Sequence, residues 1–206
     1  MREYDEAVAT YANAVSSFTR LIRQIPADRW DGPGLGEWDL RALVGHASRS
    51  LTTVITYLDT TAEREDIASP QQYYAHARAI AAADPSGVVE RGRQAGRDLG
   101  DDPVAAVDAL AESVSNKLAA DQDRLISVIG GLGMGVRQYL LTRTFELAVH
   151  GFDIAVAAEV PFTAPDDVLA DATVLAAEIA AATGRGETVL MSLTGRRALP
   201  PSFSVI

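Results

Sequence analysis

Apolar residues recur every three or four positions through four long stretches of this chain, and that spacing is typical of amphipathic helices. Proline and glycine interrupt the pattern at Pro26, in the loop 27–38 and in the glycine run 130–135. Four long helices joined in this way predict an all-α, up-and-down four-helix bundle. The helices are expected at 4–25, at 39–58 with Asp39 as the N-cap, at 102–128 and at 140–158.

The rest of the chain predicts accessories to the bundle. Short helices are expected at about 71–82 and 86–98, outside the core, and a further helix at 166–183. The glycine run 130–135 is expected to be a helix-to-helix turn, because it lacks the Lys-Ser/Thr ending of a phosphate loop. Residues 184–206 differ in character, and a strand is expected at 188–193. We therefore expect a metal-binding bundle at 1–183 and a short tail at 184–206 packed on it.

Charge and hydropathy exclude several classes of partner. The 206 residues carry a net charge of −10 and are 48% hydrophobic, which indicates a folded domain. The acidic balance and the lack of a basic patch argue against nucleic acid and anionic membranes. No run reaches the ~18 apolar residues of a membrane span, and the first residues lack the apolar core of a signal peptide. A cytoplasmic monomer or homodimer is expected.

The chain contains no cysteine and three histidines, His46, His76 and His150. Thiolate metal sites and a cysteine nucleophile are therefore excluded, and metal ligands must come from His, Asp or Glu. His76 lies in a stretch of weak periodicity and is expected to be exposed to solvent. His46 lies at the edge of the apolar face of its helix, where a lone histidine is more often a core or surface residue than a ligand.

The stretch 140–158 carries four ionisable residues on an otherwise apolar helix, namely Arg143, Glu146, His150 and Asp153. They fall within an arc of about 80°. A helix that is apolar on most sides is usually buried, and buried charges need partners or a metal. Glu146 and His150 lie one turn apart and form either an intrahelical polar pair or two metal ligands. Together with His46, they form a three-ligand set suited to a divalent metal with an open position.

Two segments resemble a known family. Residues 38–47, WDLRALVGHA, resemble the W-x-x-x-x-L-x-x-H segment of the DinB/YfiT-like superfamily. Residues 143–155, RTFELAVHGFDIA, resemble the R-x-x-E-x-x-x-H-G-x-D-x-A segment of its mycothiol-dependent maleylpyruvate isomerase branch. The resemblance covers roughly residues 5–160. It implies a DinB-like four-helix bundle that holds a divalent metal, commonly zinc, through residues that correspond to His46, Glu146 and His150.

The resemblance also implies a reaction. In that family mycothiol is activated at the metal and attacks an electrophile, so the protein needs no nucleophile of its own. We therefore expect a metal-dependent thiol transferase or isomerase that acts on a small electrophile. The isomerase carries a separate C-terminal domain that supplies an arginine to the substrate. Here the short tail offers Arg185, Arg196 and Arg197, and no motif assigns that role to any of them, which favours thiol transfer over maleylpyruvate isomerisation.

Arg143 and Asp153 are the candidate catalytic residues beside the ligands. Arg143 can hydrogen-bond Glu146 or a substrate anion, or it can form a salt bridge with Asp153 or Asp39. Asp153 can orient the imidazole of His150, as carboxylates commonly do for metal-bound histidines, or it can brace the bundle.

Three further residues follow His46 at steps of three and four and therefore lie on the same side of the predicted helix. Ser50, Thr53 and Tyr57 are candidates for lining the cosubstrate pocket, although a helix edge of mixed polarity explains them equally well.

Two other functions remain open at this stage. A metal-dependent hydrolase would need a general base that is not itself a ligand, and Asp153 is the nearby candidate. A non-catalytic metal- or ligand-binding bundle would be favoured by a fourth protein ligand that closes the site.

Overall fold

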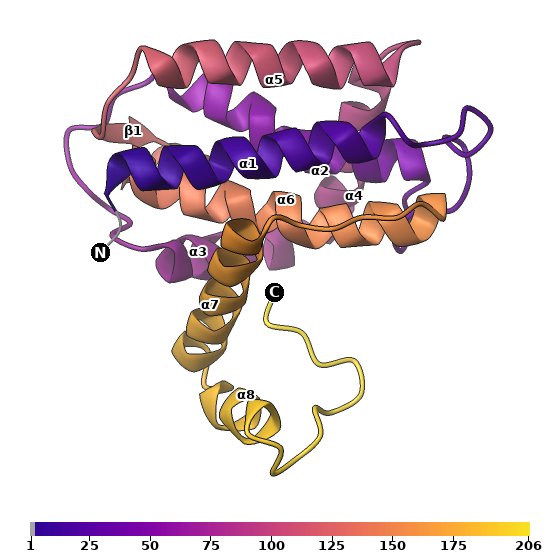
Figure 1. Cartoon of the computed structure of the whole chain (residues 1–206). Coiled ribbons are helices and arrows are strands. Elements are labelled where there is room, and N and C mark those ends of the chain that lie inside the picture. Colours follow the sequence, from indigo (N-terminus) through magenta and orange to yellow (C-terminus); the bar gives the residue numbers. More distant parts are fainter. Residues whose placement is uncertain (1–2) are drawn as a thin grey trace.

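The computed structural model describes residues 3–206, and its architecture is all-α, as predicted (Figure 1). Four helices form the bundle: α1 contacts α5 and α6, and α2 contacts the same two helices. Their inner faces bury large side chains such as Tyr11, Phe18, Leu43 and Leu140. The bundle helices are α1 (Tyr4–Ile22), α2 (Leu40–Tyr57), α5 (Pro103–Ala119) and α6 (Val136–Ala158).

Four more helices and a two-stranded hairpin surround the bundle. The predicted helices at 71–82, 86–98 and 166–183 are confirmed, with ends shifted by one residue. No helix within residues 3–206 is both long enough and apolar enough to cross a membrane. The accessory elements are α3 (Pro70–Ala83), α4 (Pro85–Asp98), β1 (Leu125–Ser127), β2 (Gly133–Gly135), α7 (Asp166–Ala182) and α8 (Gly186–Leu193).

Side-chain caps fix where α2, α3, α4 and α5 begin. Asp39 accepts a hydrogen bond from the Ala42 amide at 2.7 Å and is the N-cap of α2, as predicted. Ser69, Asp84 and Asp102 cap α3, α4 and α5 in the same way, and each is followed by proline at the first helical position. A capping oxygen satisfies an otherwise unpaired amide, and proline is preformed for the first turn. The cap on α2 sets the helical position of His46 two turns later.

The bundle is not a simple up-and-down bundle, contrary to the prediction. The amino end of α1 and the carboxyl end of α2 both lie at the hairpin end of the molecule, where Tyr4 lies near Arg124 and the Ala62 amide bonds the Leu125 carbonyl. α5 also ends there, so α2 and α5 run in the same direction (Figure 1). The connection through α3 and α4 crosses the length of the bundle and makes this possible.

The expected helix 102–128 ends at Ala119, and the glycine run is part of a hairpin rather than a direct helix-to-helix turn. Leu125 pairs with Gly135, and Ile126 with Met134, both of which are buried. At Gly133 a side chain is excluded, because its Cβ would lie 1.9 Å from the Arg64 carbonyl oxygen. The glycine therefore allows another backbone segment to approach the strand closely.

The region 60–101 packs against the bundle, which corrects the expectation that it lies outside the core. Tyr73 and Tyr74 of α3 are buried. α4 lies directly against α2, because a Cβ on Gly45 would come within 2.1 Å of the Gly96 amide nitrogen. Two glycines at the crossing therefore allow the helix backbones to touch.

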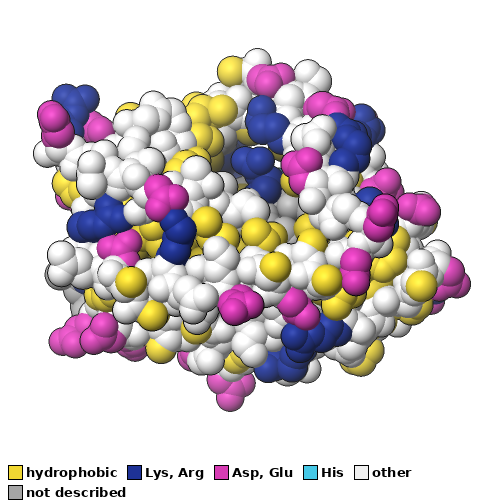
Figure 2. All heavy atoms as spheres, turned by 90° about the horizontal axis from the view of Figure 1, so that it is seen from above, with side chains coloured by type: hydrophobic (Ala, Val, Ile, Leu, Met, Phe, Trp, Pro, Cys, Tyr) yellow, Lys and Arg dark blue, Asp and Glu magenta, His cyan; other side chains and the backbone are white. Residues whose placement is uncertain are grey.

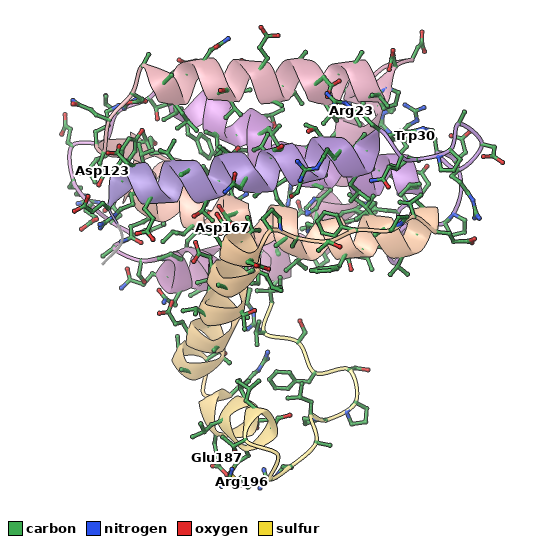
Figure 3. The ribbon with its side chains drawn as sticks, in the orientation of Figure 1. Arg23, Trp30, Asp123, Asp167, Glu187 and Arg196 are labelled. Atoms are coloured by element: carbon green, nitrogen blue, oxygen red, sulfur yellow. The ribbon has the colours of Figure 1, made fainter. Side chains whose placement is uncertain are left out.

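The segment 188–193 is helical, so the predicted strand is wrong. α8 contains it and packs on α7, which projects from the bundle (Figure 1). Glu187 and Arg196 lie at the far end of this projection (Figure 3). The described residues provide no strand beside 188–193, and a helix satisfies its backbone groups internally. The division into 1–183 and 184–206, whose first two residues lie outside the described part, stays a prediction.

Candidate metal centre

α2 and α6 bring His46, Glu146 and His150 together, and each offers one ligand atom within 4.8 Å of the others. Nε2 of His150 lies 3.2 Å from Oε2 of Glu146. The rings of His46 and His150 meet edge to face, with centroids 4.9 Å apart. Within residues 3–206 this is the one group of His, Asp and Glu with such a geometry. The predicted His/Glu/His candidate metal site therefore exists.

The donor set and its spacing fit a divalent metal. Bonds of about 2.1 Å to a tetrahedral ion place neighbouring ligand atoms about 3.4 Å apart, close to the separation of the Glu146 and His150 atoms. Two imidazoles and one carboxylate form a ligand set found for zinc and related ions, with a position left for water or substrate. The ligand atom of His46 lies within 4.8 Å of the other two, so a movement of His46 toward them completes the set.

Aromatic packing holds His46 in place. The Trp38 ring lies 4.5 Å from the His46 ring, centroid to centroid. Trp38 in turn donates from Nε1 to the Val89 carbonyl of α4 at 2.9 Å. α4 approaches the indole closely, because a Cβ on Gly92 would lie within 2.6 Å of it. The accessory helix therefore holds the tryptophan against the histidine.

Asp153 and Tyr74 hold the other two candidate ligands. Oδ2 of Asp153 lies 3.0 Å from Nδ1 of His150, the position expected of a carboxylate that orients a metal-binding imidazole. The Tyr74 hydroxyl of α3 lies 2.8 Å from Oε1 of Glu146, to which it donates. Tyr74 was missed in the sequence, because its neighbourhood shows no regular pattern and its partner lies 72 residues away.

The pKa values of Glu146 and His150 indicate how this pair on α6 is protonated in the absence of a metal. Burial lowers the pKa of His150, but hydrogen bonds to Asp153 and Glu146 outweigh it and raise the pKa to about 9. Burial raises the pKa of Glu146, but the hydrogen bond from His150 and the charge of Arg143 bring it down to about 2. At neutral pH, a protonated His150 thus lies between two carboxylates.

His46 is different. Burial is the largest cause that lowers the pKa of His46, the charge of the nearby His150 is the second, and the pKa falls to about 4. Its imidazole is therefore neutral at physiological pH and keeps a lone pair for a metal.

Arg143 is buried, and it does not form the ion pair with Asp153 or Asp39 that was considered. Its Nε donates to Oγ1 of Thr142 at 3.0 Å. Its guanidinium carbon lies 5.0 Å from the ring centroid of Tyr139 and 5.2 Å from that of Tyr73, which are cation–π contacts. No hydrogen bond joins it to Glu146 in the described residues.

The residues that follow His46 on the same side of α2 make contacts with other helices. The Ser50 carbonyl accepts from the Tyr11 hydroxyl, and Oγ1 of Thr53 accepts from the Tyr139 hydroxyl at 2.7 Å. Tyr57 is half-buried, with its ring 5.4 Å from that of Tyr139. A role of Ser50, Thr53 and Tyr57 in binding a cosubstrate stays a prediction. His76 is exposed, as expected.

The arginines of the tail make no contact with the candidate metal centre in the described chain. Arg185 donates to the Ser204 carbonyl, and Arg196 to the Thr194 carbonyl. Arg196 lies at the end of the projecting segment (Figure 3), and Arg197 is exposed.

Fold and site together define an all-α bundle with a His/Glu/His centre between two of its helices. The model of the mycothiol maleylpyruvate isomerase N-terminal domain matches residues 11–155. The chain belongs to this family, which confirms the resemblance and, at the level of the family, the expectation of an enzyme of this kind. The crystal structure of the mycothiol-dependent maleylpyruvate isomerase is similar at 16% identity and a TM-score of 0.44, over 87% of this chain and 72% of that one. None of the curated proteins matched.

Divalent metal binding is expected to depend on pH. Below a pKa of about 9, a metal must displace the proton of His150, so affinity should rise about tenfold per pH unit from pH 6.5 to 8 and level off near pH 9. Titration with Co²⁺ in buffers of different ionisation enthalpy should show about one proton released. Asp153→Asn should shift the plateau to lower pH. A pH-independent affinity would contradict the assignment of His150.

The Tyr74 hydroxyl is expected to support metal binding through Glu146. Tyr74→Phe should lower the affinity for Zn²⁺ by roughly 10- to 100-fold, the effect typical of an outer partner of a ligand. Tyr73→Phe is the matched control, because Tyr73 is the adjacent residue of α3 and makes no hydrogen bond with Glu146. Competition with a chromogenic chelator measures both. Equal affinities for the two variants would show that Tyr74 does not hold the ligand.

Proposed function

We propose that this protein is a metal-dependent enzyme that activates mycothiol for attack on a small electrophile, with His46, Glu146 and His150 as the metal ligands. The observation that carries the proposal is the convergence of these three side chains within 4.8 Å, in a chain that belongs to the family. We propose zinc as the metal.

Residues of the chain itself ionise and orient the proposed ligands. When bound, a divalent cation lowers the pKa of a coordinated thiol, so that a thiolate is available at neutral pH. Glu146 supplies a permanent carboxylate, since its pKa is about 2. Asp153 fixes the ring of His150, and Trp38 fixes that of His46. The ligands are therefore oriented before a cation arrives, which lowers the cost of ordering them.

The nucleophile must come from outside, because the chain has no cysteine. In a transfer reaction the thiol proton leaves to solvent, the sulfur forms a bond to the electrophilic carbon, and the leaving group departs with its bonding electrons. Because the thiol must stay reduced, a cytoplasmic location fits this reaction. The partners are then two small molecules, and either a monomer or a homodimer is compatible with them.

We favour thiol transfer over maleylpyruvate isomerisation. The isomerase, as noted from the resemblance, uses an arginine of a further domain. Here Arg185 and Arg196 bond carbonyls of the tail itself, Arg196 lies at the end of the projecting segment (Figure 3), and Arg197 is exposed. The hydrolase alternative is less well supported, because Asp153 is engaged with His150 and is not available as a separate base. A non-catalytic site is less well supported as well. Such a site would be closed by a fourth protein ligand, and within the described residues the group contains three.

Conjugation of mycothiol tests the proposal. The Zn²⁺-loaded protein with mycothiol and monochlorobimane should form the fluorescent conjugate faster than the uncatalysed reaction. His46→Ala should lose at least about 100-fold of this rate, since it removes a ligand and not only an outer partner. His76→Ala is the matched control, because His76 is exposed and lies outside the metal group. No turnover with a broad panel of electrophiles, or equal rates for the two variants, would overturn the proposal.

A further inference from the structure

Exposed apolar side chains are concentrated in one part of this molecule. Among residues 3–206, ten large hydrophobic side chains are exposed to solvent, and eight of them lie between Phe152 and Ile206. Single exposed hydrophobic residues are normal, but a concentration of them commonly marks an interaction site. The eight are Phe152 and Val156 on α6, Leu169 and Val174 on α7, Leu190 and Leu193 on α8, and Leu199 and Ile206 after α8.

The tail, residues 184–206, has no core of its own. None of its residues is buried, and Val205 is the tail residue that packs against the core of the bundle. α8 has eight residues and packs on α7. A helix this short is marginal in water without a packing partner. Leu190 and Leu193, which are 62% and 73% exposed, therefore offer a surface that one chain leaves uncovered.

Charge is segregated along the same part of the chain. Residues 144–183 contain seven Asp or Glu and neither Lys nor Arg, whereas the tail contains three arginines and one glutamate. On the face that carries α5, by contrast, both signs of charge lie side by side (Figure 2). The tail is thus complementary in charge to α7 and the second half of α6.

These opposite charges do not pair within one chain. The guanidinium groups of Arg185 and Arg196 bond carbonyls of the tail, and no tail arginine forms an ion pair with a carboxylate in residues 3–206. Asp166 and Asp167 form the acidic first turn of α7, and neither has a Lys or Arg partner in the part of the chain that the structure describes. Both sets of charges are therefore available to a partner.

α7 keeps the two sets apart. Figure 3 shows Asp167 where α7 leaves the bundle and Arg196 at the far end of the projection. α7 has 17 residues, which is about 25 Å at 1.5 Å per residue. A second copy, related by a two-fold axis that crosses α7, places each tail beside the acidic first turn of the other α7. One symmetry operation therefore satisfies both contacts, because every copy carries both surfaces.

From this arrangement we infer that the tail is a dimerisation element that packs on α7 of a second copy of this chain. Leu190 and Leu193 lie in the apolar centre of the interface, and Arg196 and Arg197 lie at its rim beside the first turn of the other α7. An apolar centre with a charged rim is the usual anatomy of a protein interface. The inference goes beyond the proposed function and does not depend on it, because no metal ligand takes part.

Sedimentation equilibrium of the full chain tests the dimer. Leu193→Glu should weaken the association of the wild type by at least about 30-fold, the effect of losing a residue that carries interface energy. Leu35→Glu is the matched control, because Leu35 is 43% exposed and lies in the loop before α2. A wild type that is monomeric at about 100 µM, or equal association of the two variants, would overturn the inference.

Charge reversal tests which surfaces meet. The tail variant Arg196→Glu/Arg197→Glu and the helix variant Asp166→Lys/Asp167→Lys should each dissociate, because like charges then face each other in both contacts. An equimolar mixture of the two should recover a dimer, since both contacts of the mixed pair join opposite charges. If the two folded variants stay monomeric in the mixture, the pairing of the tail with α7 is wrong.

The controls separate the interface from net charge and from folding. Arg91→Glu/Arg93→Glu makes the same change of charge on the exposed surface of α4 and should keep the wild-type dimer. Circular dichroism reports folding. If the helix variant does not fold, Leu193→Glu and the tail variant still decide the result, because their side chains are exposed in the single chain. A monomer that sediments with anionic vesicles would assign the tail to a membrane surface and overturn the inference.

Discussion

The whole account depends on one buried polar pair. Glu146 and His150 lie on α6, a helix most of whose buried side chains are apolar, and their facing atoms are 3.2 Å apart. An ionised carboxylate in such surroundings needs a positive partner. In the metal-free protein the partner is the proton that His150 holds between Glu146 and Asp153. A divalent cation would provide the same compensation, with His46 from α2 as an additional ligand. The buried carboxylate of Glu146 needs a positive charge beside it, and this need therefore both keeps the pair together and makes it a candidate metal site.

The accessory helices are more than a cover over the bundle. α3 supplies the Tyr74 hydroxyl to Glu146, and α4 presses Trp38 against His46 through a contact that only glycine permits. The long crossover that makes α2 and α5 parallel is the same segment that brings these two supports to the site. Orientation of the ligands thus depends on contacts between segments far apart in the sequence. Outer contacts of this kind commonly govern metal affinity as strongly as small changes in the ligands do.

Much of this could be predicted from local patterns. The 3–4 spacing of apolar residues located the bundle helices, and the one-turn spacing of Glu146 and His150 placed them on one face. The resemblance of the segments around His46 and His150 to the family identified the three residues that converge. These features are local, and a helix converts sequence spacing directly into spatial position.

The remaining errors concern contacts that sequence spacing does not encode. Four of the six residues 188–193 are apolar, two of the six are β-branched, and a run so short fits a helix or a strand equally well. No proline or glycine marks the end of α5 at Ala119, so the predicted helix extended into β1. Tyr74 and the α4–Trp38 contact depend on how an irregular region folds back.

X-ray absorption spectroscopy of the Zn²⁺-loaded protein tests the central claim most directly. The account predicts one bound ion per chain, with two imidazole nitrogens and one carboxylate oxygen at about 2.0–2.1 Å and a further light ligand. The imidazole signal should fall by half when His46 is replaced. A shell of oxygens alone, or a spectrum unchanged by loss of His46, would contradict it.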